Sequence, residues 1–558
     1  MFYFSFIIVI LTLTWCSCDE SPVVEMGYVS MKGKVFHAAE STKPVYAFLG
    51  VPYASPPVGD QRFSYPKRLP PMYGEFDATN YPPLCPQNVD VLANAFSSYH
   101  FPRMDTDEDC LYLNIYTPTL DRKAELAVMV WIHGGAFMNG GASAYDGSAY
   151  ATYQNVVFVA MNYRLGALGF LSTEDVNAPG NYGLLDQNIA LRWIKSNIKY
   201  FGGDQSKVTI VGESSGAMSV GFHFLSRHSR GVFERGIMES GLANCPLAYS
   251  KNPKKWAAVL AEELGCASET TKQQIECLLE KPAEEIVYAK LDAPDKPIMV
   301  FTPVVDKYFL VDDPIVLVSK GMLHRNDILL GVNNHEGGFS LLKTRVAPDL
   351  TSQFSADMFQ QVLLGMISGV MPGDNQDTVK KIAETYLGNE EDDFKAFMQL
   401  TEVIGDSFFL TPAVMFANAH NAVGGTSFFY EFQHRPSFAA SPEWVRADHG
   451  DEEKFVIGFP LMNQDEQIHI NYTSEEVELT HTMMTYWANF AKYGDPNGIE
   501  PKVISMAPDW SPYNPDEGNF MKLDVTPELA QHLKEDKVKF WMELFAALLP
   551  PSTNRDEL

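Results

Sequence analysis

The sequence predicts an α/β protein with a central, mostly parallel sheet and helices on both faces. Short apolar runs at residues 127–132 and 156–161 indicate strands buried on both faces, as such a sheet requires. Residues 183–200 place apolar side chains at roughly helical spacing between two such runs. No repeat, heptad run or low-complexity stretch divides the 558 residues. We therefore expect one large unit at residues 19–554.

Further strands follow from the same pattern. Residues 208–211 form an apolar run that Gly212 interrupts. Two later runs, 327–332 and 427–432, indicate more strands, and residues 252–433 are otherwise mostly helical in pattern. Strands that alternate with helices are typical of the α/β class.

Residues 526–549 predict a C-terminal helix. Thr526 is a suitable N-cap, and Pro527 suits the first helical position. Five apolar residues lie close to one face of this helix: Leu529, Leu533, Trp541, Leu544 and Leu548.

The composition limits the possible partners. A formal net charge of −28 argues against nucleic acid, which needs a basic face, and against anionic lipid surfaces. Solubility explains this charge, and the alternative is that its field favours neutral or cationic substrates. No segment after the N-terminus has eighteen uninterrupted apolar residues, so we expect no transmembrane helix. We also expect neither a metal nor an organic cofactor, since no metal-ligand motif appears.

The N-terminus resembles a signal peptide. Residues 2–15 are mostly apolar, and the run 6–13 is too short to span a bilayer. Cys16 and Cys18 occupy positions −3 and −1 of a plausible cleavage site before Asp19. We expect residues 1–18 to be removed, and an uncleaved anchor is the alternative.

Two further features point to the secretory pathway. Residues 555–558 read Arg-Asp-Glu-Leu, which differs from the ER-retrieval signal Lys-Asp-Glu-Leu by one residue. We expect residence in the ER lumen through the retrieval receptor, with secretion as the alternative. Asn471 begins the one glycosylation sequon.

Five cysteines remain after residue 18, which suits two disulfides and one free thiol in an oxidising compartment. Pairing of nearest neighbours gives Cys85–Cys110 and Cys266–Cys277, although several pairings are possible. Cys245 is then left over, and we expect a buried, inert thiol.

The segment 212–216, Gly-Glu-Ser-Ser-Gly, follows a predicted strand and fits the nucleophile elbow of the α/β-hydrolase fold. This turn lifts a serine hydroxyl above the sheet, and the residues two positions before and after it approach the neighbouring backbone too closely for a side chain. Gly212 and Gly216 satisfy this requirement for Ser214, whereas Glu213 and Ala217 violate it for Ser215. Ser214 is therefore the candidate nucleophile.

An oxyanion hole is predicted after the first apolar run, at residues 133–137, His-Gly-Gly-Ala-Phe. Acyl transfer places negative charge on a carbonyl oxygen, which preorganised backbone N–H groups stabilise. We assign these donors to the main chain of Gly135, Ala136 and Ser215. The alternative is an ordinary strand-to-loop turn.

A serine nucleophile needs a base and an acid that orients it. Among 13 histidines, His449 stands in a short polar loop beside a glycine. Glu336 follows a buried strand, where α/β enzymes place functional groups, and precedes two glycines. The order serine, acid, histidine is that of the α/β-hydrolases. Surface charge is the alternative for Glu336, as it is for most of the 70 acidic residues.

Several long segments resemble the type-B carboxylesterase and cholinesterase family, and most closely vertebrate liver-type carboxylesterases of the ER lumen. The likeness covers nearly all of the mature chain. It includes, besides the segments above, residues 48–54, 108–114, 180–187, 201–204 and 487–490.

The resemblance implies a carboxylic ester hydrolase with Ser214, Glu336 and His449 as the triad and an acyl-enzyme intermediate. It also implies the two nearest-neighbour disulfides. The expected substrates are esters, and beyond them thioesters and amides, of small to medium apolar compounds, xenobiotics or lipids. Ala136 replaces a glycine of many members, and Ser215 replaces the usual alanine, so fine specificity stays open.

Two rival functions are disfavoured. In cholinesterases, a tryptophan within the first disulfide loop binds choline, and residues 86–109 contain no tryptophan. Adhesion-type proteins of this fold usually lack the serine or histidine and carry a membrane anchor. This chain retains all three triad positions.

Overall fold

The structure is a computed structural model in which some segments are left undescribed. It describes residues 21–291, 293, 296–338, 354–368, 375–462, 470–499 and 508–546. The expected signal peptide at 1–18 and the tail at 555–558 lie outside the described residues.

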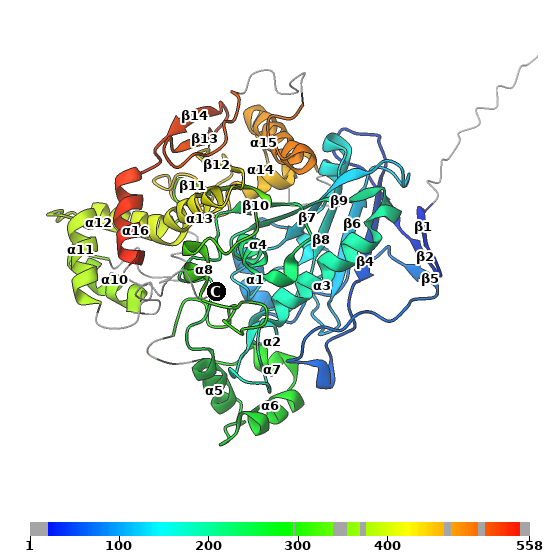
Figure 1. The fold of residues 1–558 in the computed structure, drawn as a ribbon, viewed down its shortest axis with the longest axis horizontal. Helices are drawn as coiled ribbons and strands as arrows, with labels where there is room; N and C mark the ends of the chain where they lie inside the picture. Colours follow the sequence, from blue (N-terminus) through cyan, green and yellow to red (C-terminus); the bar gives the residue numbers. More distant parts are fainter. Residues whose placement is uncertain are drawn as a thin grey trace, which may run out of the picture.

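An eleven-stranded sheet forms the centre of the molecule (Figure 1). In spatial order its strands are β14 (Glu528–Gln531), β13 (Asn519–Leu523), β12 (Ser427–Phe432), β11 (Asp327–Asn333), β10 (Arg235–Glu239), β9 (Gly203–Glu213), β7 (Leu126–Ile132), β8 (Val157–Met161), β6 (Tyr112–Thr117), β4 (Val45–Pro52) and β3 (Lys34–Phe36). Neighbouring strands from β13 to β8 run parallel, and the others pair antiparallel. The predicted mostly parallel sheet is confirmed.

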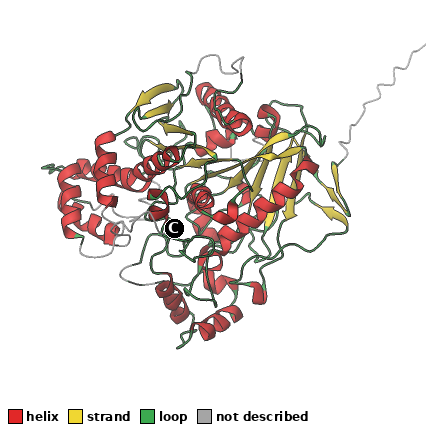
Figure 2. Cartoon of the chain, viewed as in Figure 1, coloured by secondary structure: helices red, strands yellow, loops and turns green. Residues whose placement is uncertain are grey.

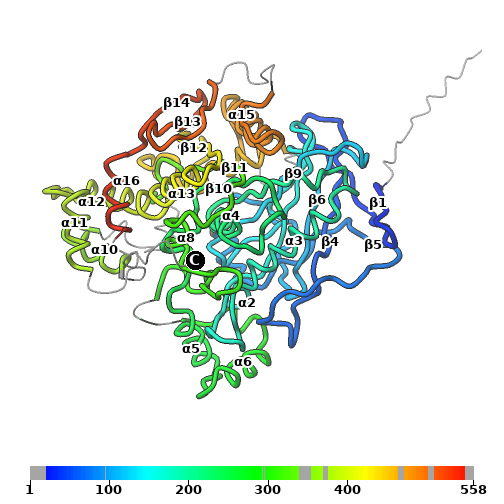
Figure 3. Tube along the Cα trace, viewed as in Figure 1, coloured from blue at the N-terminus to red at the C-terminus, as the bar shows by residue number. Residues whose placement is uncertain are grey.

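A second, three-stranded sheet comprises β1 (Val23–Met26), β2 (Val29–Lys32) and β5 (Gly74–Asp77). The α-helices are α1 (Val89–Ala95), α2 (Gly166–Phe170), α3 (Tyr182–Asn197), α4 (Ser215–Leu225), α5 (Pro253–Glu263), α6 (Thr271–Glu280), α7 (Ala283–Val287), α8 (Pro314–Ser319), α10 (Phe359–Ser368), α11 (Gln376–Tyr386), α12 (Asp393–Gly405), α13 (Thr411–Ala422), α14 (Glu453–Ile457), α15 (Ser474–Tyr493) and α16 (Glu535–Ala546). The small sheet and the group α10–α12 lie at opposite ends of the molecule (Figure 3).

Alternate residues of β7 face two separate hydrophobic cores, because successive side chains of a strand point to opposite faces. Val128 and Val130 pack into the core that contains residues of α3, α4 and α13. Met129 and Trp131 pack into the core that contains residues of α14 and α15. Helices therefore cover both faces of the sheet, as Figure 2 shows and as the apolar runs predicted.

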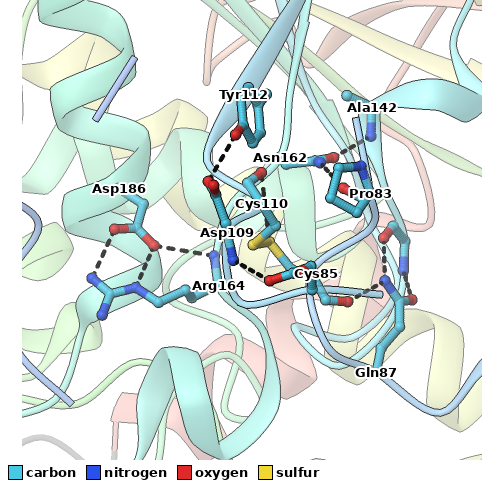
Figure 4. Close-up of a disulfide and its surroundings, with 12 residues drawn as sticks. Pro83, Cys85, Gln87, Asp109, Cys110, Tyr112, Ala142, Asn162, Arg164 and Asp186 are labelled. Atoms are coloured by element: carbon cyan, nitrogen blue, oxygen red, sulfur yellow. Dashed lines mark hydrogen bonds and ion pairs between the residues drawn. A yellow bond between two sulfur atoms is a disulfide. The ribbon is translucent and has the colours of Figure 1, made fainter. Parts of the chain in front are cut away.

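The two expected disulfides, Cys85–Cys110 and Cys266–Cys277, are both present. The first closes a loop that lies beside the buried ion pair between Arg164 and Asp186 (Figure 4). Cys245 is free and buried, and burial raises the pKa of its thiol to about 12. This thiol is therefore a poor nucleophile at neutral pH, as expected.

The prediction of one helix over residues 526–549 is wrong at its N-terminal end. Residues Glu528–Gln531 form β14, which pairs antiparallel with β13, and α16 begins only at Glu535. His532 and Lys534 between them adopt left-handed conformations, with φ of 58° and 42°. Antiparallel pairing with β13, which ends at Leu523, supplies the backbone of 528–531 with partners, and helical spacing of apolar residues does not reveal such a hairpin.

One helical stretch in the described ranges, Asp393–Ala422, is long and apolar enough to cross a membrane by length and composition alone. Seventy-eight per cent of its most apolar window is buried inside the protein, as in a core helix. It contains α12, α13 and the π-helical turn η8 (Asp406–Leu410) between them.

Candidate active site

The predicted elbow lies between β9 and α4. Ser214 has φ 55° and ψ −122°, a left-handed conformation that is strained for a residue with a side chain. A Cβ atom on Gly216 would lie 2.0 Å from the carbonyl oxygen of Ile132, and one on Gly212 would lie 2.5 Å from the carbonyl carbon of Gly216. The backbone therefore requires both glycines, which supports the choice of Ser214 over Ser215.

The structure brings together the three side chains that the sequence proposed. Nε2 of His449 lies 3.0 Å from Oγ of Ser214, and Nδ1 lies 2.7 Å from Oε2 of Glu336. The serine and the histidine are 235 residues apart in the chain. These distances suit proton transfer from the hydroxyl to the imidazole.

The loop after β11 and the loop that bears His449 are joined by their backbones. An isolated parallel bridge pairs His335 with Asp448, directly before Glu336 and His449. The side chain of Asn333 donates a hydrogen bond to the carbonyl oxygen of Asp448 at 2.7 Å. The acid and the base are thereby held next to each other.

Glu336 is fixed at both carboxylate oxygens. Oε1 accepts a hydrogen bond from the backbone N–H of Asn333 at 2.6 Å, while Oε2 faces His449. Only 2% of its side chain is exposed. The next position requires a glycine, Gly337, because a Cβ atom there would lie 2.1 Å from the carbonyl oxygen of Thr401 on α12.

His449 packs against Phe409 of η8. The ring of Phe409 lies 4.8 Å from the imidazole, between ring centroids. Burial disfavours the imidazolium, but the hydrogen bond and charge of Glu336 outweigh it, so the pKa of His449 is raised. A more basic imidazole is a stronger proton acceptor.

The predicted oxyanion loop begins directly after β7. Gly135 has φ 103°, and a Cβ on it would lie 2.0 Å from the carbonyl oxygen of Asn139. Ala136 adopts φ 60° despite its side chain. Within the described chain, the N–H groups of Gly135 and Ala136 have no backbone acceptor. Ser215 begins α4 beside them, and its Oγ accepts a hydrogen bond from the N–H of Phe137 at 3.1 Å.

The two other histidines near these motifs have structural contacts. Nδ1 of His133 lies 2.9 Å from the carbonyl oxygen of Gly134, and its ring stacks on Tyr163. Nε2 of His335 lies 2.9 Å from Oγ1 of Thr401. Burial lowers the pKa of each imidazole to about 4. Both are therefore neutral near pH 7, and neither contacts Ser214.

Sequence reasoning missed a group of buried acids around His449. Oε1 of Glu213, the residue before the nucleophile, lies 3.3 Å from Nε2 of His449. Burial and neighbouring carboxylates raise the pKa of Glu213 well above its usual value and that of Glu452 to about 8. Glu453 is also buried and accepts a hydrogen bond from the hydroxyl of Tyr99. The available signal was Glu213 itself, a large charged residue inside an elbow of small residues.

No group of three or more His, Cys, Asp or Glu side chains in the described ranges is arranged to hold a metal ion. The site instead combines a strained serine, an imidazole, a carboxylate and free backbone donors.

The carboxylesterase family model matches residues 20–541. The chain belongs to the carboxylesterase family. This membership identifies the protein as a serine carboxylesterase with the α/β-hydrolase fold.

Three relatives illustrate the range of this carboxylesterase's similarity. It is 39% identical to "Fatty acyl-CoA hydrolase precursor, medium chain" of Anas platyrhynchos, over 94% of the chain and 92% of the relative. It is 38% identical to Carboxylesterase 5A of Homo sapiens, over 94% and 89%. Neuroligin-3 of Mus musculus is 35% identical over 94% of the chain and 69% of its own length.

Proposed function

We propose that the protein hydrolyses carboxylic esters with Ser214 as nucleophile, His449 as general base and Glu336 as the acid that orients the base. The observation that supports this most directly is the pair of distances at His449, 3.0 Å to Ser214 and 2.7 Å to Glu336.

The reaction has two acyl transfers. Oγ of Ser214 attacks the ester carbonyl while His449 removes its proton, and the carbonyl π electrons move onto oxygen. The N–H groups of Gly135, Ala136 and Ser215 stabilise this oxyanion. The intermediate collapses, the alcohol leaves with the proton from His449, and an acyl-serine remains. Water, deprotonated by His449, then attacks the acyl-serine and releases the acid.

Apolar esters of small to medium size are the proposed substrates, with thioesters and amides as further possibilities. Leu363 and Met366 of α10, Phe408 of η8 and Phe545 of α16 form an apolar cluster around a small cavity of about 20 Å³ beside η8, which is too small for a substrate but makes this side of η8 apolar. The adjacent residue, Phe409, contacts His449. The name of the Anas platyrhynchos relative supports thioesters, because an acyl-CoA is a thioester.

We propose that the mature protein resides in the ER lumen, after removal of residues 1–18 and retrieval through residues 555–558. The two disulfides support an oxidising compartment. Asn471 is exposed, which suits a glycosylated position.

Replacement of Ser214 tests this proposal. Ser214→Ala should lower kcat for p-nitrophenyl butyrate by about a million-fold, because the nucleophile is lost. Ser215→Ala is the matched control: it keeps the N–H that is assigned to the oxyanion and removes only the hydroxyl that accepts the N–H of Phe137, so it should retain most of the activity. A Ser214→Ala protein with near-normal kcat would refute the assignment.

A further inference from the structure

A second cavity of about 680 Å³ lies at the surface between the first disulfide loop and β3. Its volume is within the range of about 300 to 1,000 Å³ that is typical of small-molecule sites. Phe36 and Leu49 give it an apolar floor, and both are buried. None of the proposed triad residues lines it.

A buried hydroxyl with no partner among the described residues and an exposed ammonium line the same cavity. Ser143 is 5% exposed, and its buried Oγ has no hydrogen-bond partner among the described residues. Lys34 is exposed, and its ammonium lies 5.0 Å from the centroid of the Phe36 ring. An orphaned buried hydroxyl is costly, and a ligand that accepts its hydrogen bond removes the cost.

The other charged groups of the lining are already engaged. Arg103 forms two short hydrogen bonds with Asp105, at 2.5 and 2.6 Å. Oδ1 of Asp146 accepts a hydrogen bond from the N–H of Ser148 at 2.7 Å. Lys34 is thus the lining cation that is left for a ligand.

The two walls of this cavity belong to segments that support the oxyanion loop. Gln87, in the first disulfide loop, receives a hydrogen bond from the N–H of Gly140 at 2.8 Å and donates one to its carbonyl oxygen at 2.7 Å. Asn162 joins the N–H of Ala142 to the carbonyl oxygen of Pro83 (Figure 4). Ser143, next to Ala142, lines the cavity. A ligand between these walls contacts the structure that positions the oxyanion donors.

We infer that the cavity lined by Lys34, Phe36, Leu49 and Ser143 is a second ligand site, which binds a monocarboxylate with an apolar chain. The ammonium of Lys34 and the hydroxyl of Ser143 bind the carboxylate, and Phe36 and Leu49 contact the chain. Acids of this class are the products of the reaction proposed above. The second part of the inference is that a ligand in this cavity changes kcat through the oxyanion loop. This part rests on the proposed function.

Isothermal titration calorimetry of the full-length protein with octanoate tests the site. We expect Lys34→Glu to weaken octanoate binding about ten-fold, because a charge-assisted contact becomes repulsive. Ser143→Leu should weaken it at least as much by filling the cavity. Lys32→Glu is the matched control, since Lys32 is exposed on β2 and does not line the cavity. Octanamide, which lacks the charge, should bind about ten-fold more weakly than octanoate.

Equal octanoate affinity in the Lys34→Glu and Lys32→Glu proteins would overturn the inference, because binding would then occur elsewhere, for example at Ser214. Calorimetry does not depend on turnover, so failure of the proposed function leaves this result readable. If the Ser143→Leu protein does not fold, the surface variant Lys34→Glu decides alone. A kcat for p-nitrophenyl acetate that is unchanged at saturating octanoate would overturn the coupling to the oxyanion loop.

Discussion

Replacement of Glu336 by glutamine probes the geometry around His449 with almost no change in shape. Oε1 of Glu336 accepts the backbone N–H of Asn333 at 2.6 Å, so the carbonyl oxygen of a glutamine would remain there. Its NH2 group would then face Nδ1 of His449, at the position where Oε2 now lies 2.7 Å away. Because this group donates, Nδ1 must accept, and the imidazole proton moves to Nε2. Nε2 could no longer accept the proton of Ser214.

This change of tautomer gives the expected magnitude. Loss of the correct tautomer costs about 10⁴-fold in kcat in a serine triad, which corresponds to about 5 kcal/mol of barrier at 1.36 kcal/mol per ten-fold. The assay is steady-state hydrolysis of p-nitrophenyl butyrate by Glu336→Gln, with thermal unfolding to verify the fold.

Glu213→Gln is the matched control, because Oε1 of Glu213 also lies close to His449, at 3.3 Å. Burial and neighbouring carboxylates raise the pKa of Glu213 well above its usual value, so an amide at this position changes the charge beside His449 less than it would at an ordinary carboxylate. We expect this variant to lose less than about ten-fold in kcat, since Glu213 faces Nε2 and does not fix the tautomer through Nδ1. A Glu336→Gln protein within ten-fold of wild type, or two variants that lose activity equally, would refute the reasoning.

Three further perturbations follow from the same environment. The pKa of His449 is raised, so kcat/KM should fall as the pH decreases, with the midpoint of this fall above about pH 6.5. A midpoint below that value in a pH–rate profile would count against Glu336 as the partner of His449. Ala136→Gly removes a methyl group from a residue in a left-handed conformation with φ 60°. The relief of about 1 kcal/mol of backbone strain in the folded state should offset the greater conformational entropy that glycine gives the unfolded chain. The free energy of unfolding in urea should therefore be nearly unchanged. The rate of hydrolysis of branched-alcohol esters should rise relative to that of linear esters, and a fall in this ratio would exclude a steric role for the methyl group. Lys454→Met removes a buried cation whose ammonium lies 4.7 Å from the centre of the Tyr99 ring and near several carboxylates. Without this cation, the neighbouring carboxyl groups have higher pKa values in the folded state, so their ionisation at pH 8 opposes folding more than at pH 5.5. The loss of unfolding free energy should therefore be larger at pH 8 than at pH 5.5, and a loss that does not depend on pH would contradict this.

Local sterics made the elbow predictable from sequence. Gly212 and Gly216 are demanded by contacts within a few residues and with the adjacent strand β7, so the pentapeptide and the preceding apolar run were sufficient. The buried strands were predictable for a similar reason, because their apolar residues continue without alternation.

The remaining features depend on pairing and packing that the local sequence pattern does not record. His449 and Glu336 were selected among many histidines and acids chiefly through family resemblance, and the bridge between residues 335 and 448 that joins their loops has no local signature. The strand at Glu528–Gln531 was mistaken for helix because its partner, β13, could not be inferred from helical spacing. The contact of Phe409 with His449 arises from the π-helical turn η8, which the sequence pattern did not reveal.

The central claim is that convergence of three distant side chains makes one serine hydroxyl unusually nucleophilic. A fluorophosphonate probe tests it directly, because the probe phosphonylates only an activated serine and loses fluoride. Peptide mass spectrometry after labelling should locate the adduct on Ser214 and not on its neighbour Ser215, and His449→Ala should abolish it. A protein that stays unlabelled, or that carries the adduct on Ser215 or independently of His449, would contradict the account.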